Sequence, residues 1–275
     1  MIDGLENVYG SKVQHGPHND RIYVLHLAPG EPDSLIFKLD EMACQRGYGK
    51  IFAKIPESCW QDFSSAGYVK EVEIPGFFHG NTACYFVSKF FNNRQETSEN
   101  FSELYRLSRK DFSKSVDYFS KEKCNIERCS TANAEELSLV YQQVFRSYPF
   151  PISDPSYLSQ SMDEGVRYYC IRRGDGIVAA AAIESDFHGQ NAEMTDFATL
   201  PEWQGNGFAE SLLRYMDAII DGTDGIKTVY TIARATSYGI NSVFRKCGYI
   251  FAGLLVNNTQ ISGGIRSMAV WYKHV

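Results

Sequence analysis

A glycine-rich turn between a predicted strand and a predicted helix is the segment of this sequence best suited to bind an anion. The turn, Gln204–Ala209, follows an apolar strand over 193–199 and precedes a helix over 209–220. Its backbone amides converge with the positive end of the helix dipole, which favours a phosphate group. Gly205 and Gly207 let the backbone touch such a ligand because no Cβ stands in the way.

The turn matches neither of the two common nucleotide-binding loops. The three-glycine spacing of the dinucleotide-binding motif is missing, and so is the Gly-Lys-Ser/Thr end of a P-loop. A tight strand-to-helix connection without any ligand is the alternative interpretation of these six residues. The flanking residues therefore decide between the two.

Two carboxylates interrupt the apolar strand before the turn. Glu193 and Asp196 would be costly to bury without a partner, and a carboxylate can accept the proton that an attacking amine must lose. Either residue could be a general base or could hold a substrate ammonium, and a structural ion pair is the alternative for one of them. Glu184, on the preceding strand, is a third candidate that we expect to be exposed.

Composition limits the class of protein. The 275 residues carry a net charge of −6 and seven cysteines, with no paired Cys-x-x-Cys spacing typical of a zinc site. We therefore expect a reduced, cytoplasmic protein that binds no metal and no nucleic acid. The first residues lack a signal-peptide pattern, and the most apolar run, Ile177–Ile183, is too short to cross a bilayer, so no membrane partner is expected.

Hydrophobic periodicity predicts alternating strands and helices in both halves of the chain. We expect residues 1–20 to form a polar arm and residues 101–121 a long amphipathic helix. In the first half the predicted elements are strands at 22–27, 51–55, 69–74 and 82–91 and helices at 35–46 and 60–65. In the second half they are strands at 168–172, 177–184, 193–199, 228–233, 249–255 and 267–272 and helices at 133–146, 209–220 and 240–246.

The two halves share a weak internal repeat. Ile51–Phe78 aligns without a gap to Ile232–Thr259, so that Phe63 and Gly67 meet Phe244 and Gly248. The first half has no counterpart of the glycine-rich turn. We infer that it copies the sheet and helices but has lost the phosphate-binding loop, and a chance similarity is the alternative. Its strands could pair with the second half or with another copy in a homodimer.

The order of motifs from residue 126 onward resembles the GNAT superfamily of N-acetyltransferases. The resemblance implies an α/β (α+β) protein with a mixed, mostly antiparallel sheet, preceded here by a degenerate GNAT-like half. It divides the chain into an N-terminal domain at 1–95, a helical linker at 96–125 and a catalytic domain at 126–275.

The resemblance also implies acetyl-CoA as co-substrate and a set of contacts to it. Main-chain groups of the strand end would bind the pantetheine arm, and the turn would bind the pyrophosphate. The expected cofactor-binding residues are Phe197, Ala198, Thr199, Gln204, Gly205, Asn206, Gly207, Phe208, Ala209, Asn241 and Phe244.

One position departs from the family pattern. The family often places a tyrosine near the leaving thiolate as general acid, and this sequence has Phe244 there. Asn241 would replace the family's usual asparagine, whose position is Ser237. We assign Tyr238 as the possible proton donor, beside Glu193 and Asp196 as the other catalytic residues.

Stretches along nearly the whole chain resemble a narrower group, the β-lysine N-acetyltransferases. Among them are Ile74–Phe78, Tyr148–Ile152, Ala233–Gly239 and Ser267–Tyr272. This resemblance implies acetylation of the side-chain amine of β-lysine to give N-acetyl-β-lysine, an osmolyte. Arg234 would then hold the substrate carboxylate, and Tyr148 and Phe150 would form a wall of the acceptor pocket.

Other functions remain open on the sequence alone. Another amine, such as lysine, a polyamine or a protein lysine, could be the acceptor, and tRNA-dependent aminoacyl transfer is disfavoured by the acidic charge. A non-catalytic CoA-binding module is the third possibility, which the missing tyrosine at Phe244 favours and the two strand carboxylates oppose.

Overall fold

The computed structural model describes residues 3–30, 32–112, 124–223 and 225–275. Its N-terminal half contains the strands β1 (Gly4–Val8), β2 (Ser11–Gly16), β3 (Arg21–His26), β4 (Lys50–Pro56), β5 (Val69–Phe78) and β6 (Thr82–Phe90), with helices α1 (Asp33–Arg46) and α2 (Trp60–Ser65). Helix α3 (Ser102–Ser108) follows them along the chain.

The second half contains the strands β7 (Ile126–Arg128), β8 (Arg167–Arg173), β9 (Gly176–Asp186), β10 (Asn191–Thr199), β11 (Thr228–Arg234), β12 (Ile250–Ile261) and β13 (Gly264–His274). Its helices are α4 (Ala134–Val144), α5 (Pro155–Asp163), α6 (Phe208–Thr223) and α7 (Tyr238–Lys246). Short 3₁₀ turns lie at Glu57–Cys59, Thr131–Asn133 and Pro201–Trp203.

All of these strands join one sheet, in the order β1-β2-β3-β4-β6-β5-β12-β13-β11-β10-β9-β8-β7. The order is symmetric about the contact between β5 and β12, so that β4, β6 and β5 correspond to β11, β13 and β12. In each half a parallel pair flanks a helix: β3 and β4 around α1, and β10 and β11 around α6. The N-terminal half therefore repeats the topology of the C-terminal half, as the sequence repeat predicts.

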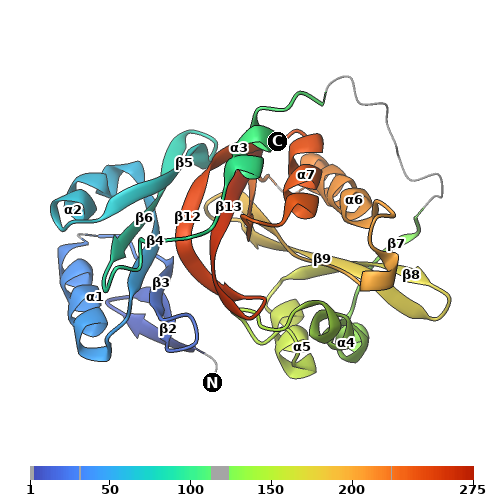
Figure 1. Ribbon diagram of the computed structural model, residues 1–275, viewed down its shortest axis with the longest axis horizontal. Coiled ribbons are helices and arrows are strands. Elements are labelled where there is room, and N and C mark those ends of the chain that lie inside the picture. Colours follow the sequence, from blue (N-terminus) through green and yellow to red (C-terminus); the bar gives the residue numbers. More distant parts are fainter. Residues whose placement is uncertain (1–2, 31, 113–123, 224) are drawn as a thin grey trace.

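The two halves meet edge to edge within one chain (Figure 1). The junction of β5 with β12 rests on a single ladder pair, Val72 with Gly253. Gly253 has φ +154°, and a Cβ there would lie 2.7 Å from the Glu71 carbonyl oxygen, so the close approach requires glycine. The structure thus selects pairing within the chain from the two possibilities that the sequence left open.

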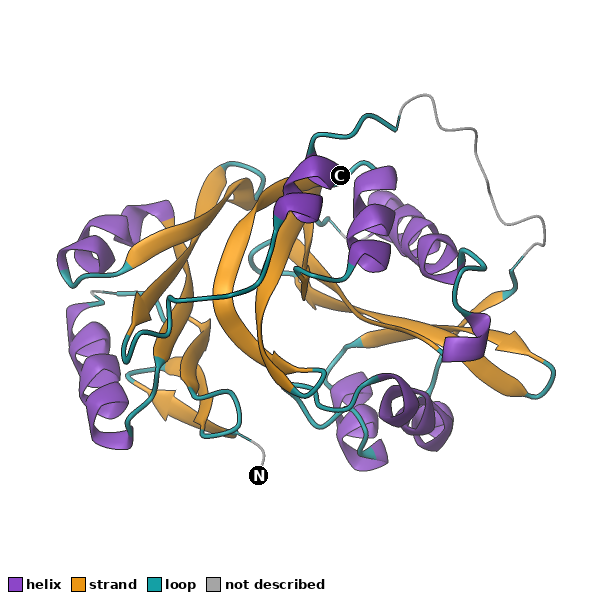
Figure 2. Cartoon of the chain, viewed as in Figure 1, coloured by secondary structure: helices purple, strands orange, loops and turns teal. Residues whose placement is uncertain are grey.

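Helices cover both faces of the C-terminal half of the sheet. Helices α6 and α7 lie on one side of β8–β10, and α4 and α5 lie on the other (Figure 2). Because β9 is covered on both faces, Ala179–Ala182 are fully buried, which explains the continuous apolar run around them. The predicted mixed, mostly antiparallel sheet is confirmed, with β3–β4 and β10–β11 as its parallel pairs.

Three sequence expectations need correction. Residues 4–16 are not a polar arm but the hairpin of β1 and β2, closed by a two-residue turn at Tyr9 and Gly10, both with positive φ. Helix α3 covers only Ser102–Ser108 of the long helix expected at 101–121, and residues 113–123 lie outside the described residues. Helix α5 was missed, although Asp154 before Pro155 is a helix-start signal, and Asp154 accepts a hydrogen bond from the Ser156 amide.

Candidate active site

A cavity of about 1230 Å³ opens between the two halves of the chain. Strands β3 and β4 contribute to its wall from one side, and β9, β10, β11 and the segment before α5 contribute from the other. The predicted site residues on this wall are Tyr148, Phe150, Glu193, Asp196, Phe197, Thr199, Gln204, Gly205, Gly207, Phe208, Ala209, Arg234 and Phe244. The fold therefore brings the phosphate-binding turn and both strand carboxylates to one continuous space.

A β-bulge in β10 explains how Glu193 and Asp196 face the same side. The register of β10 against β9 shifts between Thr195 and Ala198, and Asp196 itself has φ +55°. In a regular strand, residues three apart point to opposite faces, and the extra residue of a bulge reverses that alternation. Both carboxylates consequently line the cavity.

Glu193 lies in a row of polar side chains that crosses β9, β10 and β11 and ends at β4. Its ladder partners are Glu184 on β9 and Tyr230 on β11. Two glutamates directly opposite each other repel when both are charged. Beyond Tyr230 the row ends at Lys54 of the N-terminal half, whose Nζ donates a hydrogen bond to the Tyr230 hydroxyl over 2.9 Å.

The environment of this row raises the pKa of its two glutamates. Burial raises the pKa of Glu193, while Lys54 and a hydrogen bond with Tyr230 oppose the rise. Glu184 has an exposed side chain, as expected, because it borders the open cavity. The protein around that cavity still removes enough water to raise the pKa of Glu184 to about 8, with repulsion from Glu193 and Asp196 adding to the effect. We infer that Glu193 ionises before Glu184.

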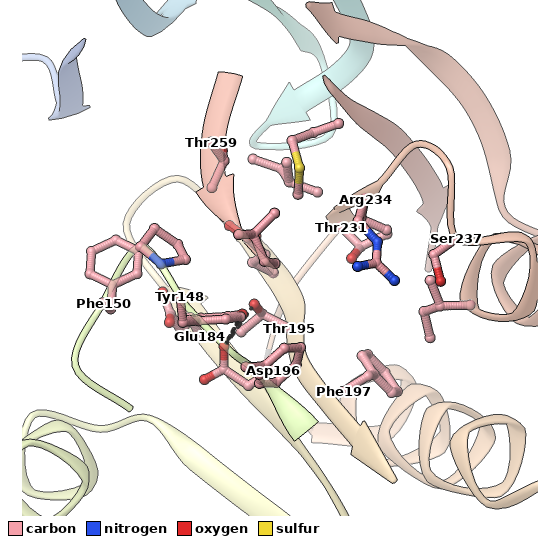
Figure 3. A pocket seen from close by; sticks show the side chains of 18 of the residues that line it. Tyr148, Phe150, Glu184, Thr195, Asp196, Phe197, Thr231, Arg234, Ser237 and Thr259 are labelled. Carbon is pink, nitrogen blue, oxygen red and sulfur yellow. Dashed lines mark hydrogen bonds between the residues drawn. The ribbon is translucent and has the colours of Figure 1, made fainter. Parts of the chain in front are cut away.

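Asp196 is held by a phenol from the loop before α5. The Tyr148 hydroxyl donates to Asp196 Oδ1 over 2.7 Å, the contact drawn as a dashed line in Figure 3. Burial raises the pKa of Asp196, and the hydrogen bonds from Tyr148 and Thr195 counteract it. Tyr148, which the sequence predicts as a wall residue of the acceptor pocket, therefore also orients the Asp196 carboxylate.

The turn before α6 has the geometry expected of an anion site. Gly205 and Gly207 have φ values of +84° and +77°, and no atom lies within 4 Å of a Cβ built on either of them. Helix α6 begins at Phe208, so its first-turn amides have no acceptor within the helix. This open, donor-rich turn fits the pyrophosphate of CoA.

The strands on either side of the cavity separate as they approach this turn. Strands β10 and β11 pair only at Asn191–Glu193 with Thr228–Tyr230, although both strands continue. Main-chain groups of Phe197 and Thr199 therefore lie beside a gap in the ladder. A pantetheine arm could pair with this free edge, as the sequence resemblance implies.

Four predicted residues lie off the described wall of the cavity. Ala198 is buried in the core beneath α4. The Asn206 side-chain amide donates to the carbonyl of Trp203, just before the turn. Asn241 is fully buried, donates to the carbonyls of Arg234 and Ser237, and accepts from the Trp271 indole. Its side chain therefore braces the start of α7 rather than reaching a ligand.

Tyr238 is the fourth of these residues. Its side chain does not line the cavity, so the geometry does not support its predicted role as proton donor. Its half-exposed side chain lines a separate pocket of about 120 Å³, together with residues of α3 such as Leu104 and Leu107. Phe244, in contrast, lies on the cavity wall and packs edge-on against Phe197 at 5.4 Å.

Several wall residues were missed by the sequence interpretation. Tyr23 and Lys54 come from the half that was expected to have lost the phosphate-binding loop, and Tyr157 comes from the missed helix α5. A lysine within the apolar stretch Ile51–Ile55 was a usable signal, by the reasoning applied to Glu193: a charge in a buried strand needs a partner.

Two absences can be stated for the described part of the chain. No group of three or more His, Cys, Asp or Glu side chains is arranged there to hold a metal ion. None of the helices in that part combines the length and apolarity needed to span a membrane.

Comparison with known proteins finds one family that matches part of the chain and relatives that match most or nearly all of it. The Acetyltransferase (GNAT) family matches residues 134–249. A β-lysine N(6)-acetyltransferase of Methanococcus maripaludis is 36% identical, over 99% of this chain and 99% of its own length. A β-lysine N(6)-acetyltransferase of Methanosarcina mazei is 26% identical over 88% and 97%, and the N-acetyltransferase YodP of Bacillus subtilis is 32% identical over 78% and 76%.

Proposed function

Because this chain belongs to the GNAT family of acetyltransferases, we propose that it transfers the acetyl group of acetyl-CoA to the terminal amine of β-lysine. The observation that carries the proposal is the match to a β-lysine N(6)-acetyltransferase at 36% identity over 99% of both chains. The acidic row beside the phosphate-binding turn supports it, because β-lysine presents two ammonium groups to the cavity.

The proposed division of labour follows the geometry of the cavity. The amides of Gln204–Ala209 hold the pyrophosphate, and the free edge of β10 at Phe197 and Thr199 holds the pantetheine arm. When bound there, acetyl-CoA supplies an activated acetyl group. The bulge then sets Glu193 and Asp196 beside the acceptor amine.

Glu193 is the proposed general base. It is connected through Tyr230 to a cation, so it can ionise while its neighbour Glu184 still holds a proton. A carboxylate in this state can take the proton that the amine releases as it attacks. Asp196, fixed by Tyr148, is proposed to hold and orient the attacking amine.

The experiment that tests the function measures thiol release from acetyl-CoA with four acceptors side by side: β-lysine, α-lysine, spermidine and a lysine-containing peptide. A kcat/KM for β-lysine at least ten times that of the other acceptors is expected. Selectivity for another acceptor would replace the proposed substrate. Binding of CoA without turnover on any amine would favour a CoA-binding module instead.

A further inference from the structure

The N-terminal half, which has no phosphate-binding turn, presents one strand face to the cavity. Arg21 and Tyr23 of β3 and Phe52 and Lys54 of β4 all line the cavity wall. Tyr23 is the ladder partner of Phe52, and their rings pack at 4.7 Å. This face is aromatic with two cations, whereas the opposite wall carries Glu184, Glu193 and Asp196.

Lys54 is the cation on this face that lies beside the acidic row. An ammonium group has three N–H donors. One reaches the Tyr230 hydroxyl and Tyr23 accepts another, which leaves one donor for a ligand. The ion pairs found within the described residues do not include Lys54. Its Nζ also lies 5.7 Å from the Tyr23 ring centre and 5.3 Å from that of Tyr230, which fixes the group in place.

Lys54 keeps its charge in this setting. Burial alone would lower its pKa, but attraction from the Tyr23 and Tyr230 oxygens and from Glu193 outweighs burial and raises the pKa well above its usual value. Arg21 binds the Asn258 carbonyl and the Thr259 hydroxyl through Nη1, and its Nε has no hydrogen-bond partner. Arg21 is only 3% exposed, however, whereas Lys54 is half-buried and lies beside Tyr230. Lys54 is therefore the better placed of the two to receive an anion.

Arg234, the residue predicted for the acceptor carboxylate, lies elsewhere in the cavity. Figure 3 shows Arg234 near Thr231 and Ser237, apart from Tyr148 and Asp196. Arg234 is the last residue of β11, beyond Tyr230, where the pairing of β11 with β10 ends. The gap between these strands is where the pantetheine arm is proposed to bind. A carboxylate at Arg234 would therefore compete with the acetyl donor for space.

We propose that Lys54 binds the carboxylate of the acceptor, so that the N-terminal half selects amino acids over simple amines. Tyr230 positions the ammonium group of Lys54, and Glu184 lies within the same row to face the acceptor's second ammonium. The inference rests on the proposed function, because β-lysine has a carboxylate at the end remote from the acetylated amine. Through Lys54, the N-terminal half that lacks the phosphate-binding turn would contribute to substrate specificity.

The test compares two acceptors that differ only in the carboxylate: β-lysine and 1,4-diaminopentane. Because Lys54 also supports ionisation of Glu193, Lys54→Met should lower kcat for both acceptors by a similar factor. Only for β-lysine should the KM rise as well, by about 10- to 100-fold, the usual range for a lost charged hydrogen bond, so that kcat/KM falls more for β-lysine than for 1,4-diaminopentane. Lys54→Arg should recover most of the affinity for β-lysine.

Lys70→Met is the matched control, because Lys70 is an exposed lysine of the same half that pairs with Glu73 on the surface. Its kinetics should equal those of the unaltered protein for both acceptors. Equal losses on the two acceptors in Lys54→Met would overturn the inference, as would a carboxylate-specific loss in Arg234→Ala instead. If the unaltered protein fails to acetylate β-lysine, the proposed function falls first, and the inference falls with it.

Discussion

Glu193 and Asp196 share one face of β10, yet their surroundings give them different partners. Glu193 is connected to a tyrosine and a lysine across the sheet, whereas Asp196 accepts a hydrogen bond from Tyr148. Glu193 is the proposed base because the Lys54 ammonium, at the end of its row, balances the negative charge that Glu193 carries once it ionises. Mutating each carboxylate in turn distinguishes the general base from the residue that holds the amine.

Glu193→Gln should lower kcat by about 10²- to 10⁴-fold, the usual contribution of a general base. The Kd of acetyl-CoA should stay the same, because the pyrophosphate site is remote from this residue. Asp196→Asn should act mainly on the KM of the amine. Steady-state kinetics together with CoA titration checks both, and a larger loss of kcat in Asp196→Asn would exchange the two assignments.

Glu184 should make folding stability depend on pH. Its pKa is about 8 in the folded protein against 4.5 for the ordinary group, so the folded state holds more protons than the unfolded state between these values. The stability that this proton contributes is complete below about pH 4.5 and is lost as pH rises through about 8.

Glu184→Gln removes that dependence. The variant should gain stability relative to the unaltered protein between pH 5 and pH 8.5, as measured by urea unfolding at each pH. Parallel unfolding midpoints across the whole range would contradict the raised pKa of Glu184.

At the scale of elements, the turn before α6 depends on backbone conformation. Gly207→Ala places a Cβ on a residue with φ +77°, which costs about 1 kcal/mol, and also crowds the space where a phosphate is proposed to bind. The Kd of acetyl-CoA should rise about tenfold, whereas binding of S-acetylpantetheine, which lacks the pyrophosphate, should not change.

Gly174→Ala provides the control for backbone strain in the turn. Gly174 also has positive φ, at +57°, with open space around its Cβ, but it lies in the hairpin between β8 and β9 and not on the cavity wall. It should lose similar stability and bind acetyl-CoA normally. If both glycine variants weaken acetyl-CoA equally, the effect belongs to stability and not to the phosphate site.

At the scale of the whole molecule, a buried ion pair reinforces the narrow junction between the halves. Lys50 Nζ donates to Glu71 Oε2 over 2.8 Å and to the Val256 carbonyl over 2.7 Å, and Glu71 Oε1 accepts from the Val256 amide over 2.6 Å. Both side chains are almost wholly buried. The cavity needs walls from both halves, so this junction also shapes the site.

Glu71→Gln should destabilise the protein by about 3–5 kcal/mol, because it leaves the Lys50 ammonium buried without its counter-charge. Glu73→Gln, two residues along the same strand, breaks an exposed pair with Lys70 and should cost less than about 1 kcal/mol. Urea unfolding measures both, and equal effects would show that the buried pair does not stabilise the junction.

The division of the chain into domains at 1–95, 96–125 and 126–275 stays a prediction that limited proteolysis can test.

The sequence by itself determined most of the elements and the local motifs. Alternating apolar residues and the Gln204–Ala209 turn are short-range features, so they predicted the strands, the helix start and the anion site from neighbouring residues. The two carboxylates of β10 were identified for the same reason, since each is an exception within one apolar strand. The internal repeat followed from matching positions such as Phe63 and Phe244.

Only the tertiary structure decided which distant residues share the cavity. The bulge at Asp196 depends on pairing with β9, and no local pattern indicates where a ladder shifts register. Lys54 meets Tyr230 because two strands far apart in the sequence approach across the junction of the halves, which is a long-range packing event. The same packing buried Asn241 and moved Tyr238 away, because the side of a short helix that faces a cavity is set by its neighbours.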